Sequence, residues 1–300
     1  MKLAPIILFV YNRKWHTEQT IKALKKNLLA SRSDLFIYSD GPKTDKVINQ
    51  VQEIREYLKS IQGFKTITII EKKKNLGLAK SIIGGVTEII SKYGKAIILE
   101  DDLITSPYFL NFMNSALDHY KNVEKVWHIS GWSYPIALKN KSDIYLHRTM
   151  NCWGWATWAS NWKFFEKNTK KLMNKFSKDD IKRFNLDGVT NTFWKQVLLN
   201  HKKKIDTWAV YWYASIFVNN GLCLNPSKSF VKNIGFDGSG NHTFDIFYKD
   251  NVTLNKKKKI NFDILIKEDD KIIEKIKIYF RLIKKNFLLK LLSKVIFKKI

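Results

Sequence analysis

The segment Ala96-Ile97-Ile98-Leu99-Glu100-Asp101-Asp102 joins a short apolar run to three consecutive carboxylates. The apolar half predicts a fully buried strand, and carboxylates are rarely buried without a partner. In open α/β sheets, ligands bind beyond the carboxyl ends of the strands. We therefore interpret the acidic triplet as a site whose oxygen ligands suit Mg²⁺ or Mn²⁺ carrying a substrate diphosphate. A solvated loop with acidic helix-capping residues is the alternative.

Apolar runs alternate with amphipathic stretches over the first 130 residues. This order predicts an α/β fold, Rossmann-like, with right-handed crossovers and a mostly parallel sheet covered by helices on both faces. The expected strands are 6–10, 35–38, 64–70 and 96–99, and the expected helices are 17–29, 45–61 and 78–91. The first strand is too short for a signal peptide and lacks a cleavage site, and no apolar run is long enough to span a bilayer.

Polar residues follow the other three expected strands as well. Asn12 and Arg13 follow the first, Asp40 follows the second, and Asn75 and Lys80 follow the third. Parallel strands end at one edge of a sheet, so we expect these residues to meet the acidic triplet there. Individually, Asp40 is also a common turn residue and Asn75 a common helix cap.

The net charge of +26 admits nucleic acid, an anionic membrane or an acidic substrate as partner. The basic residues are almost all lysine, whereas base readout depends on arginine, and no nucleic-acid-binding motif is present. Only two cysteines occur, Cys152 and Cys223, outside any metal-binding spacing. This pattern argues against a disulfide framework or structural zinc and favours a reducing compartment.

Tryptophan is dense between residues 127 and 212. Large aromatic side chains usually pack in a core, but they also cover the apolar face of sugars in binding pockets. We expect residues 131–255 to complete one catalytic domain with residues 1–130, the first half binding the nucleotide and the second the acceptor.

A basic tail begins near residue 256. Residues 271–300 carry a net charge of +9, and their apolar residues recur every three or four positions. This pattern predicts an amphipathic helix, either lying on an anionic membrane or docked on the domain with its lysines in solvent.

Several motifs together resemble a GT-A fold glycosyltransferase of the bacterial family 2 type. The acidic segment is similar to that of the β-1,2-N-acetylglucosaminyltransferases. The resemblance covers roughly residues 4–245 and excludes the basic tail. It rests on these segments: Ser39-Asp40-Gly41, Asn75-Leu76-Gly77, Leu99-Glu100-Asp101-Asp102-Leu103, Cys152-Trp153-Gly154-Trp155-Ala156-Thr157-Trp158, Asp206-Thr207-Trp208, Asn233-Ile234-Gly235 and His242-Thr243.

The resemblance implies a divalent metal and a nucleotide-sugar donor. Asp102 would bind Mn²⁺ or Mg²⁺, which stabilises the charge that grows on the leaving diphosphate. Donor-binding roles fall to seven further residues. Glu100 and Asp101 would position the ribose and the donor sugar, Asp40 would accept a hydrogen bond from the base, and Asn12, Arg13, Asn75 and Lys80 would complete the nucleotide site.

An inverting transfer also needs a base for the acceptor hydroxyl. Asp206 is the candidate, although the eukaryotic relatives read Asp-Asp-Trp where this chain has Asp206-Thr207-Trp208. If the second acidic position is the base, Thr207 stands there and Asp206 must substitute. His242 follows a glycine-rich stretch and would reach the metal or the diphosphate once substrate binds, or else remain solvated.

The sequence thus predicts a hexosyl- or N-acetylhexosaminyltransferase acting in polysaccharide or lipopolysaccharide biosynthesis. We expect it in the cytoplasm, peripheral on the inner face of the membrane, acting on a glycan or lipid-linked acceptor and binding no nucleic acid. A nucleotidyltransferase acting on sugar phosphates is one rival, although the first loop, Tyr11-Asn12-Arg13-Lys14, has no glycine to cradle a phosphate. A non-enzymatic basic adaptor for membrane or nucleic acid is another, but it does not explain the acidic triplet.

Overall fold

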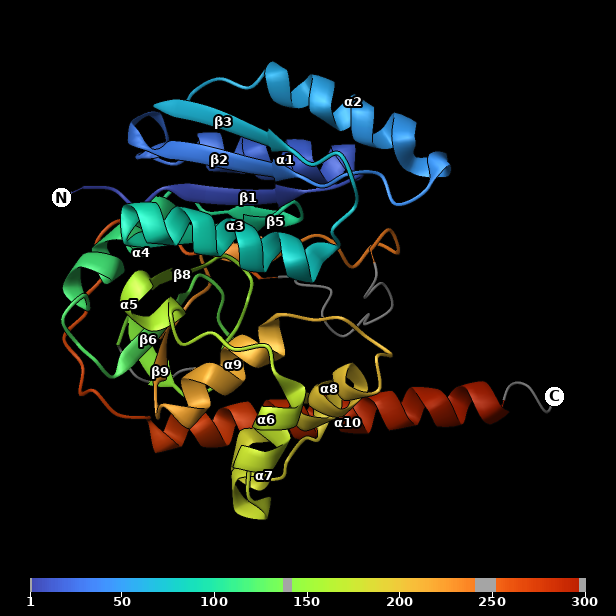
Figure 1. The fold of residues 1–300 in the computed structure, drawn as a ribbon. Coiled ribbons are helices and arrows are strands. Elements are labelled where there is room, and N and C mark those ends of the chain that lie inside the picture. The colour runs from blue at the N-terminus through green and yellow to red at the C-terminus, as the bar shows by residue number, and fades with distance from the viewer. Residues whose placement is uncertain (1, 137–141, 241–251, 297–300) are drawn as a thin grey trace.

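An eight-stranded sheet forms the centre of the protein, and helices lie over both of its faces (Figure 1). The computed structural model describes residues 2–136, 142–240 and 252–296, with the side chains of the last helix described as far as residue 284. The strand order is β3-β2-β1-β4-β8-β6-β9-β7, and four of the seven neighbouring pairs are parallel. The strands are β1 (Ile6–Val10), β2 (Asp34–Ser39), β3 (Thr66–Glu71), β4 (Lys95–Glu100), β6 (Val126–Ser130), β7 (Ile144–His147), β8 (Trp155–Trp158) and β9 (Leu222–Pro226).

Ten α-helices and a small second sheet make up the rest of the described regular structure. The second sheet pairs β5 (Leu103–Thr105) with β10 (Val231–Asn233) in antiparallel fashion. Two short 3₁₀ helices, η1 (Ala30–Arg32) and η2 (Asp45–Val47), precede β2 and α2. The α-helices are α1 (Lys14–Lys25), α2 (Ile48–Lys59), α3 (Leu78–Tyr93), α4 (Phe109–His119), α5 (Ala159–Trp162), α6 (Thr169–Lys175), α7 (Lys178–Phe184), α8 (Thr192–His201), α9 (Ala209–Val218) and α10 (Asp270–Ile296).

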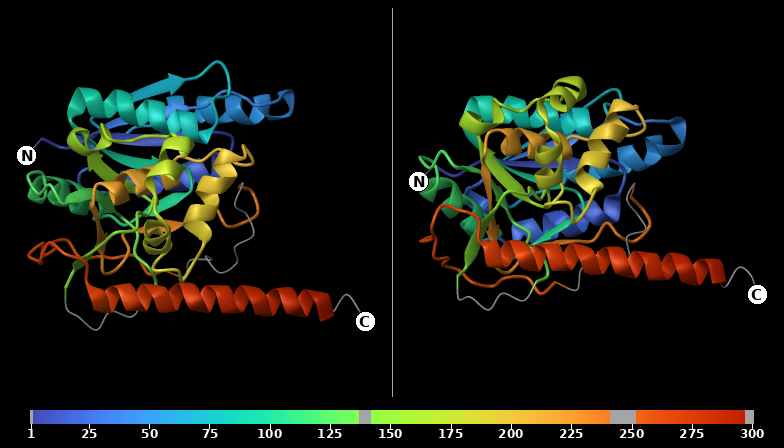
Figure 2. Two further views of the ribbon diagram at one scale, coloured as in Figure 1. Left: turned by 60° about the horizontal axis from the view of Figure 1, so that its bottom comes forward. Right: turned by 90° about the horizontal axis from the view of Figure 1, so that it is seen from below.

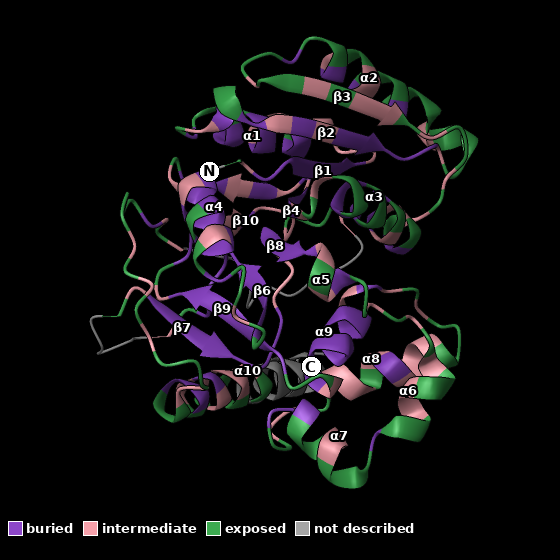
Figure 3. Cartoon of the chain, turned by 60° about the vertical axis from the view of Figure 1, so that its left-hand side comes forward, coloured by how far each residue is buried: buried purple, intermediate pink, exposed green. Residues whose placement is uncertain are grey.

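The central strands are buried on both faces because alternate residues enter two different cores (Figure 3). In β1, Ile6 and Leu8 pack with α1, α2 and α4, whereas Ile7 and Phe9 pack with α3 and the tryptophan-rich segment. At the edge of the sheet, β3 has no fully buried residue. The predicted α/β class, with helices on both faces of a mostly parallel sheet and a C-terminal helix, is confirmed.

The helix expected over residues 17–29 is α1, which begins three residues and ends four residues earlier. After Lys25 the chain leaves the helix in tight turns, and the amide of Asn27 bonds to Leu24. The Asn27 side chain then donates to the carbonyl of Ala23 and to the hydroxyl of Thr105, which favours the turn over another helical turn. Leu28, expected on the buried face, is consequently 52% exposed.

The tryptophan-rich segment is mostly core, as one of the two sequence interpretations predicted. The rings of Trp155 and Trp208 stack 5.2 Å apart, and those of Trp162 and Trp212 lie 4.9 Å apart. All four are buried between β8, α5 and α9. Such aromatic pairs add to the stabilisation that burial alone provides.

The basic tail docks on the domain through its first turns (Figure 2). Ile272 and Ile276 are buried in a small apolar cluster with Trp132, Tyr134 and Tyr145. The chain before α10 is also held, because Glu268 pairs with the guanidinium of Arg148. This arrangement matches the docked-helix alternative for the start of α10. Of the described helices, none combines the length and apolar character needed to cross a membrane.

Candidate functional site

The acidic triplet lies at the carboxyl end of β4, where the strand gives way to a tight turn. Strands β1 to β4 are mutually parallel, so the segments that follow them leave from the same edge of the sheet. The turn is fixed from α1, since the hydroxyl of Thr20 donates to the carbonyl of Asp101 and accepts from the amide of Leu103. The sequence-predicted edge is therefore present, with the triplet at its centre.

Arg13 provides the positive charge next to the acidic triplet. Its guanidinium bonds to the carboxylates of both Asp101 and Asp102, the latter at 2.9 Å. Arg13 stands at the N-cap of α1, directly after β1, so the parallel pairing of β1 with β4 brings it to the triplet. Three residues that the sequence assigned to one site from separate segments are thus in direct contact.

Burial makes this concentration of negative charge costly. It raises the pKa of Glu100 and of Asp101, and Asp102 raises both further. Arg13 and the backbone amide of Tyr11 oppose this rise at Asp101. Burial acts to lower the pKa of Arg13, yet the two aspartates raise it above its ordinary value. A cation at this point is therefore required electrostatically, and Arg13 supplies it.

The same chemistry fits a divalent metal. Within the described part of the chain, no three His, Cys, Asp or Glu side chains are grouped so that they could hold a metal by themselves. Mg²⁺ and Mn²⁺ in phosphate chemistry commonly use one or two carboxylates and take further ligands from the substrate and water. Asp102, more exposed than Asp101, fits such a site. The predicted ligand His242 lies outside the described residues.

The segment after β10 closes over Asp102. The amide of Ile234 donates to the carbonyl of Asp102 at 2.9 Å. A Cβ on Gly235 would lie 2.2 Å from the Oδ2 atom of Asp102 and 3.1 Å from a terminal nitrogen of Arg13. A side chain at position 235 would therefore displace the carboxylate of Asp102 or the backbone that covers it. The glycine of Asn233-Ile234-Gly235, part of the family resemblance, is explained by that close approach.

Two features of the residues after Arg13 were not expected from sequence. Nε2 of His16, on α1, lies 2.9 Å from a carboxylate oxygen of Asp237 and ties the covering segment to α1. Trp15, the residue before it, is 57% exposed, although large aromatic residues are usually buried.

The segment before β8 forms another wall. Burial raises the pKa of the Cys152 thiol, and the nearby carboxylates of Glu100 and Asp102 raise it further. The half-buried ring of Trp153 lies 5.6 Å from that of Phe236. This pair places aromatic surface beside the acidic triplet, in line with the second sequence interpretation of the tryptophan-rich block.

Asp40 bonds to the backbone and side chain of the loop after β3. Its Oδ1 accepts from the amides of Gly41 and Leu76, and its Oδ2 accepts from the amide of Gly77 and the side chain of Asn75. A carboxylate has about four acceptor positions, so these four bonds occupy them. Asp40 and Asn75 therefore hold the loop that leads into α3, and a hydrogen bond from the base to Asp40 stays a prediction.

The remaining predicted residues lie apart from the Arg13 cluster or at its margin. Asn12 directs its amide to Gln50 at 3.0 Å, and Lys80 is exposed in the first turn of α3. Asp206 lies in the segment before α9, with its side chain 61% exposed and paired with Lys167. Arg13, Asp101 and Asp102 are therefore in direct contact. Asp40 and Asn75 contact each other separately, and Asp206 is paired with Lys167.

No protein-family model and no curated protein sequence matches the chain. Among solved structures, it is similar to the mannosyltransferase PcManGT from Pyrobaculum calidifontis in complex with GDP-Man and Mn²⁺, at 10% identity and a TM-score of 0.41 over 71% of this chain and 69% of that chain. It is also similar to S. aureus TarS 1-349, at 9% identity and a TM-score of 0.44, over 79% of this chain and 61% of that one. At these identities the likeness concerns the fold.

Proposed function

We propose that this protein is a metal-dependent glycosyltransferase that moves a hexose or N-acetylhexosamine from a nucleotide-sugar donor to a glycan or lipid-linked acceptor. The observation that carries the proposal is the cluster of Arg13, Asp101 and Asp102 at the carboxyl end of a core strand. A buried arrangement of this kind is costly for stability alone, since two adjacent acids depend on one cation. The arrangement is explained if the carboxylates bind a cationic ligand.

Asp102 is the proposed metal ligand, because it is the more accessible aspartate and the covering segment packs directly on it. Mn²⁺ or Mg²⁺ bound there would neutralise the diphosphate as the glycosidic bond breaks. Asp101 is almost fully buried and bonded to Arg13, so it positions the guanidinium. Once Asp102 holds the metal, Arg13 retains N–H groups for a donor phosphate. Glu100 precedes Asp101 at the end of β4, and we propose that it contacts the donor.

The nucleotide would lie along the same edge, between the segments after β1 and β3. Asp40 fixes the loop Asn75-Leu76-Gly77, whose backbone then borders this space. Asn12, in the segment between β1 and α1, and Lys80, on α3, flank it and supply polar groups for the nucleotide or diphosphate. The aromatic pair Trp153 and Phe236, on the other side of the triplet, is proposed to contact a sugar.

Asp206 remains the proposed base of an inverting transfer. Its ion pair with Lys167 must open, or the segment before α9 must move, for the carboxylate to meet an acceptor hydroxyl. His242 is proposed to reach the metal or diphosphate when donor is bound.

We also propose that the protein works at an anionic membrane surface that carries its acceptor. The residues that α10 exposes are not those of the apolar stripe identified from sequence. Lys271, Ile278 and Leu282 fall on one side of the helix by their spacing, and both apolar residues are exposed, at 49% and 54%. Exposed apolar residues beside lysines favour peripheral binding to anionic lipid.

A donor-hydrolysis assay across a panel of nucleotide sugars, with and without Mn²⁺, tests the central proposal. The wild-type protein should release nucleoside diphosphate from one donor only with metal. Asp102→Ala should lose this activity and keep its melting temperature within a few degrees, since Asp102 is not part of the apolar core. Asp118→Ala, at an exposed ion pair on α4, is the matched control. Wild-type turnover by Asp102→Ala in Mn²⁺ refutes the site, and pyrophosphate release from a sugar phosphate and nucleotide would indicate a nucleotidyltransferase.

A further inference from the structure

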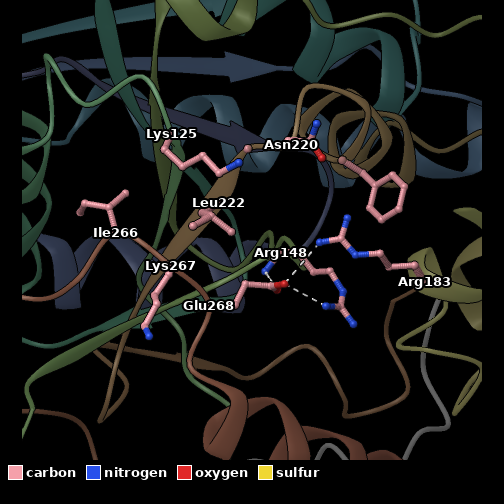
Figure 4. A pocket seen from close by; sticks show the side chains of 10 residues that line it. Lys125, Arg148, Arg183, Asn220, Leu222, Ile266, Lys267 and Glu268 are labelled. Carbon is pink, nitrogen blue, oxygen red and sulfur yellow. Dashed lines mark hydrogen bonds and ion pairs between the residues drawn. The ribbon is translucent and has the colours of Figure 1, made fainter.

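Figure 4 shows the side chains that line a small cavity of about 230 Å³. Lys125 and Leu222, at the starts of the parallel strands β6 and β9, contribute to its wall. Both β4 and β6 run antiparallel to β8, so β6 is parallel to β4. The start of β6 is therefore remote from the end of β4, and the cavity is separate from the candidate catalytic site.

Positive charge dominates the lining of this cavity. Lys125, Arg148, Arg183 and Lys267 line it, and the only acidic lining residue is Glu268. Glu268 binds Arg148 at 2.9 Å and lies 3.5 Å from Arg183. Neither Lys125 nor Lys267 forms an ion pair with any described residue. The cations thus outnumber the acid that faces them, which raises the local concentration of anions.

Arg148 supplies a second, independent sign of a missing ligand. This residue is 6% exposed, and its two terminal nitrogens bind Glu268 and Asp187. Its Nε–H is also buried, but it has no acceptor among residues 2–136, 142–240 and 252–296. Buried donors are nearly always satisfied, because an unmade hydrogen bond is costly. An anionic oxygen in the cavity would provide the acceptor.

The size and chemistry of the cavity select the ligand. Pockets for drug-sized ligands and cofactors measure about 300–1,000 Å³, so this space suits a smaller group. Arginine forks and lysine ammonium groups are the side chains that bind phosphate oxygens. We infer that the cavity binds a phosphate group, held by Lys125, Arg183 and the Nε–H of Arg148.

The cavity lies beside the segment that leads into α10, so a bound phosphate would hold this segment against the domain. Lys267 and Glu268 line it and lie just before Asp270, the first residue of α10. A phosphate bound there adds a contact between β6, α7 and the segment that carries the basic helix. The group is either a soluble phosphate or the headgroup of an anionic phospholipid on which α10 rests, and both present the same oxygens.

The first experiment measures thermal unfolding of the full chain in sodium phosphate and in sodium chloride at equal ionic strength. The melting temperature of the wild-type protein should rise with phosphate and saturate. Lys125→Gln, at an exposed and unpaired residue, should weaken the apparent affinity about tenfold, and Lys125→Gln with Arg183→Gln still further. The double variant Lys22→Gln, Lys26→Gln at the C-terminal end of α1 removes two positive charges elsewhere and should behave as wild type. An equal response in the wild type, both Lys125 variants and the α1 control, or no response in the wild type, overturns the inference.

The second experiment identifies the source of the phosphate. Flotation with phosphatidylcholine vesicles, with and without phosphatidic acid, is repeated for the wild type, Lys125→Gln and the α1 control. Selective loss of phosphatidic-acid binding in Lys125→Gln identifies a lipid headgroup. Saturable stabilisation by soluble phosphate, with vesicle binding equal in all three proteins, identifies a soluble ligand. Donor hydrolysis should be unchanged in Lys125→Gln, because the cavity lies at the other edge of the sheet.

Discussion

Gly235 offers the sharpest test of how the acidic site is built. Replacing it with alanine adds one methyl group at a point 2.2 Å from Oδ2 of Asp102 and 3.0 Å from Cγ. Gly235 is not among the glycines with positive φ, so the substitution imposes no left-handed strain on the backbone. Its effect therefore arises from the contact with Asp102 itself.

The expected magnitude follows from that distance. Ordinary contact between such atoms needs about 3.5 Å, so the carboxylate or the covering segment must move by roughly 1 Å. A displacement of that size at a catalytic group can cost about 10²-fold in rate. The bond between Arg13 and Asp102 would weaken as well, costing about 1–2 kcal/mol of stability. In a chain of this length, that lowers the melting temperature by only a few degrees.

The assay is donor hydrolysis and transfer as a function of Mn²⁺ concentration, beside a melting curve. Gly235→Ala should need more Mn²⁺ for half-maximal activity and turn over about 100-fold more slowly. Gly84→Ala is the matched control, because no atom lies within 4 Å of its added Cβ on α3. It should keep full activity and melt at an equal or slightly higher temperature. Gly235→Ala with wild-type activity and metal dependence would show that Asp102 does not act from this position.

Three further substitutions test separate parts of the molecule. Asp206→Asn should slow transfer by about 10²-fold while donor binding, measured by calorimetry, stays unchanged; parallel loss of binding would make Asp206 a binding residue. Burial, and then Asp102 and Asp101, raise the pKa of Glu100, so the folded state retains a proton that the unfolded chain loses. Stability should therefore fall as pH rises from about 4.5 toward neutral, and melting curves of metal-free Glu100→Gln should show less of this fall. Ile276→Ala should lower the free energy of unfolding in urea by about 2–5 kcal/mol, because Ile276 is fully buried; no change would mean that α10 is not docked.

The fold could be predicted from sequence because its signals are local. Fully apolar runs such as residues 6–10 and 96–99 can be satisfied only inside a sheet covered on both faces. Their alternation with amphipathic segments then limits the topology to right-handed crossovers. The end of α1 was less predictable, since the side chain of Asn27 competes with the helix through bonds to Ala23 and Thr105.

The candidate site was predictable as a place but not as a set of contacts. That Arg13, Asp40 and Asp102 lie along one edge follows from the parallel strands. Which of these side chains touch one another does not follow from the strands. A loop of a few residues can direct a side chain toward the site or toward the backbone of the loop itself. Arg13 points toward Asp102 in the site, whereas Asp40 bonds to the backbone of the neighbouring loop. The contact of Gly235 with Asp102 joins residues more than 130 positions apart and carries no local signal.

The sequence by itself predicted an amphipathic helix over residues 271–300, because the three- and four-residue recurrence of apolar side chains is a property of the chain alone. It could not determine what the apolar stripe faces, since lipid and a protein surface bury the same groups with similar gain. The tertiary structure decided this for the first turns. The cluster around Trp132 and Tyr145 covers Ile272 and Ile276, and the pairing of Arg148 with Glu268 fixes the chain before the helix. The part of the stripe formed by Ile272 and Ile276 is therefore core, and the outward side of the described turns carries Ile278 and Leu282 beside lysine.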